Sequence, residues 1–287
     1  SWNHIKTKDL LCKEGPRKGD LMKQFQGSDT YIASPELVRS VNIAAALQKP
    51  LLIKGEPGTG KTMLAQSIAD SLGMKLFIWN IKSTTKAQDG LYVYDTVQRL
   101  YDSQFGAEGV DDIKKYIHLG KLGEAFSEDQ QSVLLIDEID KADLEFPNVL
   151  LWELDRMEFY IPETGETVCT KKRPIVIITS NAEKELPDAF LRRCIFHYIA
   201  FPDPDMMRQI IHAHDPNLEE TLVNAAIKAF YDLRKLSGLS KKPGTSELLD
   251  WVRALVIGGI DAETLSEEIP FIGVLLKKTE DLKRVGY

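Results

Sequence analysis

Short, uninterrupted apolar runs recur through the first two thirds of the chain, and segments with helical spacing separate them. Five runs have the length of a strand: residues 50–53, 75–80, 132–136, 175–179 and about 196–200. The segment 34–48, ahead of the first run, and the segment 144–156, between the third and fourth runs, repeat their apolar positions every three or four residues, which is typical of helices packed on one face. Strands that are apolar throughout are buried on both sides. The pattern therefore predicts an α/β fold, with a parallel sheet covered by helices on both faces.

After the punctuating segment Phe201–Asp205 the pattern becomes helical only. Helices are expected at about 205–214, 218–236, 245–257 and 271–285. Residues 1–30 show little periodicity and are expected to form a loosely held arm. The domain prediction is therefore an arm at 1–30, an α/β domain at 31–202 and a small all-helical domain at 203–287. Within the α/β domain, residues 87–121 are expected to form surface loops and short helices, and 158–170 a β-hairpin.

One glycine-rich segment links the first predicted strand to an amphipathic helix. Its sequence, Gly55-Glu56-Pro57-Gly58-Thr59-Gly60-Lys61-Thr62, fits the pattern G-x-x-x-x-G-K-[ST]. The glycines let several backbone N–H groups point at one anion, to which the helix N-terminus adds partial positive charge. Lys61 is expected to reach the β- and γ-phosphates, and the Thr62 hydroxyl to ligate Mg²⁺. Residues 55–62 therefore predict the binding of a nucleoside triphosphate.

Two adjacent acids, Asp137 and Glu138, end the apolar strand at 132–136. Bare carboxylates are costly to bury, so a pair at the end of a buried strand indicates a cation or a catalytic role. Ligands of open parallel sheets bind at the carboxyl ends of the strands. We expect Asp137 to hold Mg²⁺ and Glu138 to accept a proton from the water that attacks the γ-phosphate.

Composition narrows the range of partners. The chain has 287 residues, with 36 Lys and Arg against 43 Asp and Glu, which gives a net charge of −7. This balance argues against a broad nucleic-acid or anionic-membrane surface. The three cysteines, Cys12, Cys169 and Cys194, are widely spaced and imply neither a disulfide framework nor zinc. With no apolar leader and no run long enough to span a membrane, the expected location is the cytoplasm.

The acid pair Asp137-Glu138, together with the glycine-rich loop, resembles the AAA+ superfamily. In that resemblance the run 175–181 is the first sensor strand, with Asn181 placed to orient the lytic water. The segments 186–194, 165–167 and 244–251 look like those of MoxR-type AAA+ ATPases, most closely the branch that contains CoxD-like proteins. The resemblance covers about residues 31–287. It implies that the helical domain is a lid on the nucleotide-binding domain.

The resemblance also implies a hexameric ring with ATP bound between neighbouring subunits. Arg193 matches the arginine finger that enters the neighbour's site, and the adjacent Arg192 is an alternative that could share or replace that role. Where many relatives carry the Arg of the second sensor, this chain has Glu247. An acid is unsuited to touch the γ-phosphate, which leaves open whether Arg253, Lys241 or Lys242 substitutes for it, or whether the function is absent.

The expected function is Mg²⁺-dependent ATP hydrolysis that drives remodelling or maturation of another protein. Relatives of the MoxR type imply a partner with a von Willebrand factor A (VWA) domain, and the CoxD-like branch implies maturation of metalloenzymes. Tyr92, Tyr94 and Tyr101 lie where such rings often carry client-contacting loops. The alternative is a nucleic-acid motor or nucleotide-gated DNA-binding module, which the net charge disfavours. The lack of an N-K-x-D-like guanine reader favours ATP over GTP only mildly.

Overall fold

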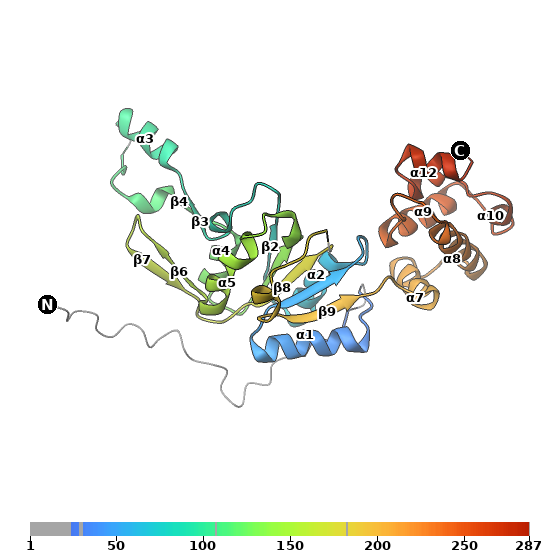
Figure 1. Ribbon diagram of the computed structural model, residues 1–287, viewed down its shortest axis with the longest axis horizontal. Coiled ribbons are helices and arrows are strands. Elements are labelled where there is room, and N and C mark those ends of the chain that lie inside the picture. The colour runs from blue at the N-terminus through green and yellow to red at the C-terminus, as the bar shows by residue number, and fades with distance from the viewer. Residues whose placement is uncertain (1–23, 29–30, 107, 182, 287) are drawn as a thin grey trace. The chain divides into compact units, whose positions relative to one another are not determined.

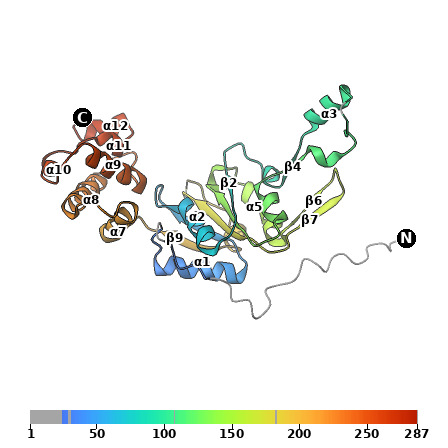
Figure 2. The same cartoon turned by 180° about the vertical axis from the view of Figure 1, so that it is seen from behind.

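The computed structural model describes residues 24–28, 31–106, 108–181 and 183–286 (Figures 1 and 2). Most of the expected arm at 1–30 lies outside the described residues. The elements follow in this order: α1 (Pro35–Leu47), β1 (Leu51–Gly55), α2 (Lys61–Leu72), β2 (Leu76–Asn80), 3₁₀ helix η1 (Ala87–Gly90), β3 (Tyr92–Tyr94), α3 (Thr96–Gln104), 3₁₀ helix η2 (Ile113–Tyr116), β4 (Ile117–Leu119), α4 (Lys121–Ser127), β5 (Val133–Asp137), 3₁₀ helix η3 (Ile139–Lys141), α5 (Phe146–Arg156), β6 (Glu158–Ile161), β7 (Glu166–Cys169), β8 (Ile175–Ser180), α6 (Asp188–Leu191), β9 (Ile195–Ile199), α7 (Pro204–His214), α8 (Glu220–Lys235), α9 (Thr245–Ile257), α10 (Thr264–Glu267), α11 (Ile272–Leu275) and α12 (Thr279–Arg284).

The five predicted apolar runs form one parallel sheet, in the order β2-β5-β8-β1-β9. The pairings of β2 with β5, β5 with β8 and β8 with β1 are all parallel. Strands β2, β5 and β8 follow one another in the chain as well as in the sheet, whereas β1 lies between β8 and β9. Parallel neighbours of this kind are joined by crossover connections that carry the chain over the sheet. The α/β fold with a parallel sheet is confirmed.

The central strands are buried on both faces, as their continuous apolar sequences require. Leu134 and Ile136 of β5 belong to a cluster that includes Leu122 and Phe126 of α4 and Leu150 of α5. The alternate residues of β5 and β8 are buried as well: Val133, Leu135, Ile175 and Ile177. A strand with both side-chain sets removed from water needs a cover on each face. The prediction of a sheet covered on both sides is therefore confirmed.

The chain divides into two compact units. The first contains Pro35–Lys54 and Ile68–His197, and the second contains Gly27–Ser34, Gly55–Ser67 and Tyr198–Tyr287. The second unit has its own core on the helices, built around the fully buried Trp251 and Phe230. The glycine-rich segment thus belongs to the same unit as the helices. The domain limits 1–30, 31–202 and 203–287 stay a prediction.

Two expected helices differ from those in the structure. The single helix expected at 271–285 is instead α11 and α12, separated by extended backbone at Leu276 and Lys278. The carboxylate of Asp281, which is 1% exposed, accepts hydrogen bonds from the backbone N–H groups of Ser240 and Lys241 and so ties α12 to a distant loop. Tertiary contact of this kind overrides local periodicity. The helix expected at 186–193 is only the single turn α6.

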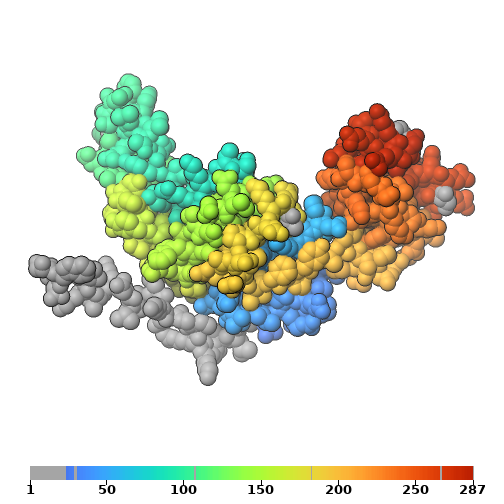
Figure 3. Space-filling view, viewed as in Figure 1, coloured from blue at the N-terminus to red at the C-terminus, as the bar shows by residue number. Residues whose placement is uncertain are grey.

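The weakly patterned segment 87–121 contains more order than expected. It includes the antiparallel pair β3–β4 and the helix α3, none of whose residues is buried. In Figure 1 α3 projects beyond the sheet of its unit, and in Figure 3 the same segment forms a protrusion. The hairpin predicted at 158–170 is confirmed as the antiparallel pair β6–β7. Within the described residues, no helix has the length and apolarity to cross a membrane.

Candidate functional site

The glycine-rich segment forms a tight loop between β1 and α2. Gly58 and Gly60 have φ angles of +79° and +78°, a region that residues with a side chain rarely adopt. Gly55 is needed for a different reason, because a Cβ there would lie 2.6 Å from the carbonyl oxygen of Ile199. The three glycines of the pattern are thus explained by backbone conformation and close approach.

Lys61 begins α2 with its ammonium group turned back onto the loop. Its Nζ donates to the carbonyl oxygens of Gly55 at 2.9 Å and Glu56 at 2.7 Å, and the residue is only 7% exposed. The Thr59 hydroxyl donates to the same Glu56 carbonyl at 2.9 Å. Lys61 therefore places a buried positive charge against the loop backbone.

The two acids at the end of β5 are joined by Thr179, which is fully buried in β8. The Thr179 hydroxyl donates to Asp137 Oδ1 at 2.5 Å and accepts the backbone N–H of Glu138 at 2.8 Å. One side chain thus fixes the orientation of the first acid and the backbone of the second. The strand pattern did not reveal Thr179, which stands within a run of apolar residues as a β-branched strand former.

Glu138 occupies an unusual backbone conformation at the exit of the strand. Its φ of 58° and ψ of 51° are left-handed, which is uncommon for a non-glycine residue and frequent at functional sites. Asn181 Nδ2 donates to Glu138 Oε1 at 2.9 Å, and Lys141 Nζ donates to Glu138 Oε2. This hydrogen bond holds the pKa of Lys141 above its ordinary value. Both carboxylate oxygens of Glu138 are therefore engaged.

Asp140 is a second residue that sequence reasoning did not identify. It is 2% exposed, and its carboxylate accepts the backbone N–H groups of Glu183 at 2.8 Å and Asn181 at 3.4 Å. Buried carboxylates require such partners. Asp140 thereby fixes the chain after β8, so that the Asn181 amide faces Glu138. An acid three residues after Asp137, in the turn that follows the strand, was the available signal.

The parallel pairing of β5 and β8 explains why these residues meet. Val133 lies opposite Ile175 and Ile136 opposite Ile178, so both strands end at the same edge of the sheet. Asp137 and Glu138 therefore come together with Thr179 and Asn181, as ligand sites in such sheets do. Lys54, directly before the glycine-rich loop, lies opposite Ser180 in the neighbouring pair β1–β8.

The two candidate finger arginines differ in their contacts. Arg193 Nε donates to Asp155 Oδ2 at 2.8 Å, and Arg193 Nη1 donates to the Ala189 carbonyl at 3.0 Å. The side chain of Arg192 is exposed and makes no hydrogen bond or ion pair with the described residues. The Arg193–Asp155 pair is about half exposed at both ends, so it is weak and breaks easily.

Glu247 has a structural role at the start of α9. Its Oε2 accepts the backbone N–H of Gly244 at 3.2 Å, which caps the helix. Lys241 Nζ lies 3.8 Å from Glu247 Oε1, and Arg253 Nη1 lies 3.9 Å from Asp250 Oδ1. Lys242 is exposed. Lys241 and Arg253 therefore each lie beside an acid of α9. A different arginine, Arg234, contacts the glycine-rich loop, because its Nη2 donates to Glu56 Oε2 at 2.8 Å.

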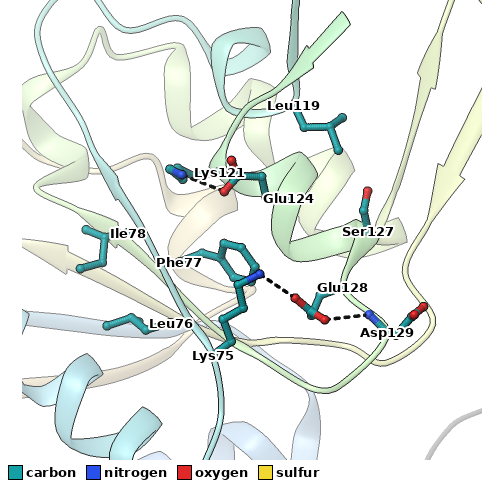
Figure 4. Close-up of a pocket in the computed structure, with 10 residues that line it drawn as sticks. All are labelled: Lys75, Leu76, Phe77, Ile78, Leu119, Lys121, Glu124, Ser127, Glu128 and Asp129. Atoms are coloured by element: carbon teal, nitrogen blue, oxygen red, sulfur yellow. Dashed lines mark hydrogen bonds and ion pairs between the residues drawn. The ribbon is translucent and has the colours of Figure 1, made fainter. Parts of the chain in front are cut away.

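A pocket of about 660 Å³ lies in the first unit, between β2 and α4 (Figure 4). It is lined by Phe77, Ile78 and Leu119 together with charged residues at its rim. Lys75 pairs with Glu128 at 3.0 Å and Lys121 with Glu124 at 2.8 Å, so these rim charges neutralise one another. None of the residues predicted to bind nucleotide lines this pocket.

The tyrosines expected to contact a client are not equivalent. Tyr92 is 5% exposed, and its hydroxyl donates to Glu163, which contradicts a direct surface role. Tyr101 is 57% exposed on α3, beside the exposed Val97 and Leu100. The three residues follow helical spacing, so α3 carries an apolar face directed at solvent.

The side chains present fit a triphosphate with Mg²⁺. The loop offers a buried ammonium on a glycine-shaped backbone at a helix start, which suits a polyanion. The hydroxyl of Thr62 and the carboxylate of Asp137 are oxygen ligands of the kind Mg²⁺ prefers. In the described part of the chain, no three His, Cys, Asp or Glu side chains gather as a metal site.

Comparison with known proteins identifies the family. The chain is 29% identical to an uncharacterised protein of Staphylococcus epidermidis over 217 residues, which cover 73% of this chain and 76% of that one. It is 28% identical to an uncharacterised protein of Staphylococcus haemolyticus, over 79% of this chain and 83% of that one. It is 34% identical to the chaperone protein ClpB of Chlamydia caviae over 66% of this chain, but only 22% of ClpB. Residues 51–202 match the ATPase family associated with various cellular activities, AAA. The chain belongs to the AAA family of ATPases.

Proposed function

We propose that this chain is a Mg²⁺-dependent ATP hydrolase that drives the remodelling or maturation of a partner protein. In this proposal the loop 55–62 binds the phosphates, with Lys61 on the β- and γ-phosphates. Thr62 and Asp137 would hold Mg²⁺, which would supply positive charge to offset that of the phosphate oxygens. Glu138 accepts the proton of the attacking water, and Asn181 orients that water.

The observation that carries the proposal is the hydrogen-bonded group Asp137–Thr179–Glu138–Asn181. It links two acids and an amide at the ends of two neighbouring strands, through hydrogen bonds of 2.5 to 2.9 Å in which Glu138 takes part with its backbone N–H as well as its carboxylate. A merely structural acid pair at a helix start would need neither a buried threonine nor a left-handed glutamate. Such strain is kept where function requires a fixed geometry.

We further propose that the chain acts as a hexameric ring, in which Arg193 enters the neighbour's site and offsets charge on the γ-phosphate. Arg192 is the competing finger, and its side chain, which makes no hydrogen bond or ion pair with the described residues, supports that alternative. In this ring the helical segment 203–287 of each subunit would be the lid on its nucleotide-binding domain.

The client in this proposal is another protein. The MoxR resemblance favours a partner with a VWA domain and, through its CoxD-like branch, the maturation of metalloenzymes. The relationship to the chaperone ClpB supports protein remodelling in general. The exposed apolar face of α3 is a suitable surface for polypeptide. A cytoplasmic location stays a prediction.

A nucleic-acid motor gains no support from the basic run at residues 171–173. The densest basic run is already engaged: Lys171 contacts Asp129 at 2.5 Å, Lys172 contacts Gln130 at 3.0 Å, and Arg173 contacts the Asp155 carbonyl at 2.8 Å. Phosphate binding would have to displace these partners.

The test is a turnover assay on the purified chain, with sedimentation in parallel. We expect phosphate release from ATP that requires Mg²⁺, assembly of a ring when ATP is bound, and no steep salt-dependent binding of DNA or RNA. A monomer without turnover would contradict the proposal. A turnover rate that rises on adding DNA or RNA would support the nucleic-acid motor instead. Identifying the proteins that co-purify with the native complex then tests the VWA partner.

A further inference from the structure

Arg234 is a buried cation on the apolar face of α8. The residue is 9% exposed, and among the described residues Lys61 is the only other buried Lys or Arg. Removing a guanidinium from water is costly unless charged or hydrogen-bonding partners surround it. The contacts of Arg234 therefore indicate what it holds in place.

Four segments of the second unit meet at this guanidinium. Arg234 Nη2 donates to Glu56 Oε2 at 2.8 Å, and Nη1 donates to the carbonyl oxygen of Pro243. The guanidinium carbon lies 3.4 Å from the centroid of the Phe201 ring. A planar fork that donates in two directions while it stacks on a ring is specific to arginine, and lysine cannot reproduce it.

The segment that Arg234 holds at Pro243 also touches the phosphate loop directly. The backbone N–H of Thr245 donates to the Gly58 carbonyl at 3.3 Å. A Cβ on Gly58 would lie 3.1 Å from the Cα of Gly244, so the two backbones are in close contact. Arg234 and the start of α9 thus fix the first half of the loop at two points, Glu56 and Gly58.

Glu56 links the two buried cations. Its carboxylate accepts from Arg234, while its carbonyl oxygen accepts from Lys61 at 2.7 Å. The Glu56 side chain is 48% exposed, whereas that of Arg234 is 10% exposed. The buried Arg234 is therefore the partner that holds Glu56 in place. A shift of Glu56 would move the backbone against which the Lys61 ammonium lies.

We propose that Arg234 is a positioning residue that sets the nucleotide affinity of the phosphate loop by holding Glu56 and Pro243. This inference rests on the proposed function, because it assumes that the loop binds ATP. Arg234 acts through Glu56 and does not itself touch the nucleotide. If Arg234 only packed the helices together, its replacement would lower stability without changing the affinity of the folded protein.

The experiment compares Arg234→Lys, Glu56→Gln and the double variant in the full chain. Calorimetry gives the Kd of ATP and of ADP, and thermal unfolding without nucleotide gives stability. We expect each single change to raise both Kd values about tenfold, since each removes a charge-assisted hydrogen bond. The Kd values of the double variant should be no higher than those of the single variant that binds less tightly, because both changes break the same Arg234–Glu56 contact. Lys235→Ala, which removes the exposed pair Lys235–Asp232, is the matched control and should bind like the parent.

Kd values within twofold of the parent in both single variants, or additive effects in the double variant, would overturn the inference. Should Arg234→Lys not fold, Glu56→Gln decides alone, because its side chain is half exposed and is not required by the helical core. A parent protein that binds neither ATP nor ADP would refute the proposed function itself, whereas a parent that binds tightly beside unaffected variants refutes only the role of Arg234.

Discussion

Thr179 Oγ1 lies 2.5 Å from Asp137 Oδ1, and through this contact a buried strand residue orients the acid proposed to hold Mg²⁺. The same hydroxyl accepts the Glu138 backbone N–H at 2.8 Å. A hydroxyl that donates and accepts at once cannot be replaced by a methyl group of the same shape. Thr179 therefore connects the fold of β8 to the chemistry proposed for β5.

Thr179→Val should lower ATP turnover by about 10- to 100-fold, as the loss of a partner that orients a ligating side chain commonly does. Thr179→Ser should keep most of the turnover, because it retains the hydroxyl. Phosphate release at saturating Mg²⁺-ATP measures both. Equal activity of the valine and serine variants would show that only the volume of Thr179 matters.

Lys61→Ala should raise the Kd of ATP at least tenfold, because it deletes the buried ammonium of the loop. Calorimetry measures the affinity. Lys228→Ala, which changes an exposed lysine of α8, is the control and should bind as the parent does. If Lys61→Ala binds ATP as tightly as Lys228→Ala, the loop 55–62 is not the phosphate site.

Arg193→Ala should still bind ATP, since the phosphate loop is intact, while its hydrolysis should fall by about three orders of magnitude if the arginine acts as a finger. Mixing Arg193→Ala with Glu138→Gln subunits should restore part of the turnover, because one shared interface then receives an intact finger and an intact base. Asp155→Ala, which frees Arg193 from its exposed pair, should not reduce turnover. Complementation by Arg192→Ala and not by Arg193→Ala would assign the finger to Arg192.

Apolar periodicity predicted the sheet because its strands are buried on both faces and therefore contain little besides apolar residues. The loop 55–62 could also be predicted from the sequence, since its pattern lies in consecutive residues. The roles of Thr179, Asp140 and Arg234 could not be predicted from the sequence, because they arise from contacts across 42, 43 and 178 positions of the chain. The contacts of Asp281 could not be predicted for the same reason, because its partners Ser240 and Lys241 lie 41 and 40 positions away. Pattern reveals what a residue's neighbours in sequence require, but not which distant backbone needs a hydrogen-bond acceptor.

Cys194 should resist alkylation in the folded protein. Burial raises the pKa of its thiol from 9.0 to about 12, so the reactive thiolate is scarce at mildly alkaline pH. Cys194 is partly buried, so treatment with iodoacetamide followed by mass spectrometry of the Cys194 peptide should show much slower modification in the folded protein than in denaturant. Native reaction as fast as in the unfolded chain would contradict the burial of Cys194.

The same shift has a consequence for stability, with a definite sign. The folded state keeps the Cys194 proton at pH values where the unfolded chain has lost it, so this thiol favours unfolding as the pH rises above 9.0. The stability that the buried, protonated thiol contributes to the folded state is complete below the pKa of the unfolded chain, and it is lost progressively as the pH rises to the folded pKa of about 12. Cys194→Ala should therefore flatten the alkaline fall in the free energy of unfolding, as measured by urea titration.

The most direct test of the proposed ATPase is Glu138→Gln. The amide keeps the shape of the side chain and a hydrogen-bond acceptor for Asn181, but it cannot take a proton from water. We expect calorimetry to show an ATP affinity within a few-fold of the parent, and phosphate release to be slower by about 100-fold or more, the usual contribution of a general base. Turnover equal to that of the parent would remove Glu138 from the reaction and contradict the hydrolytic site proposed at the end of β5.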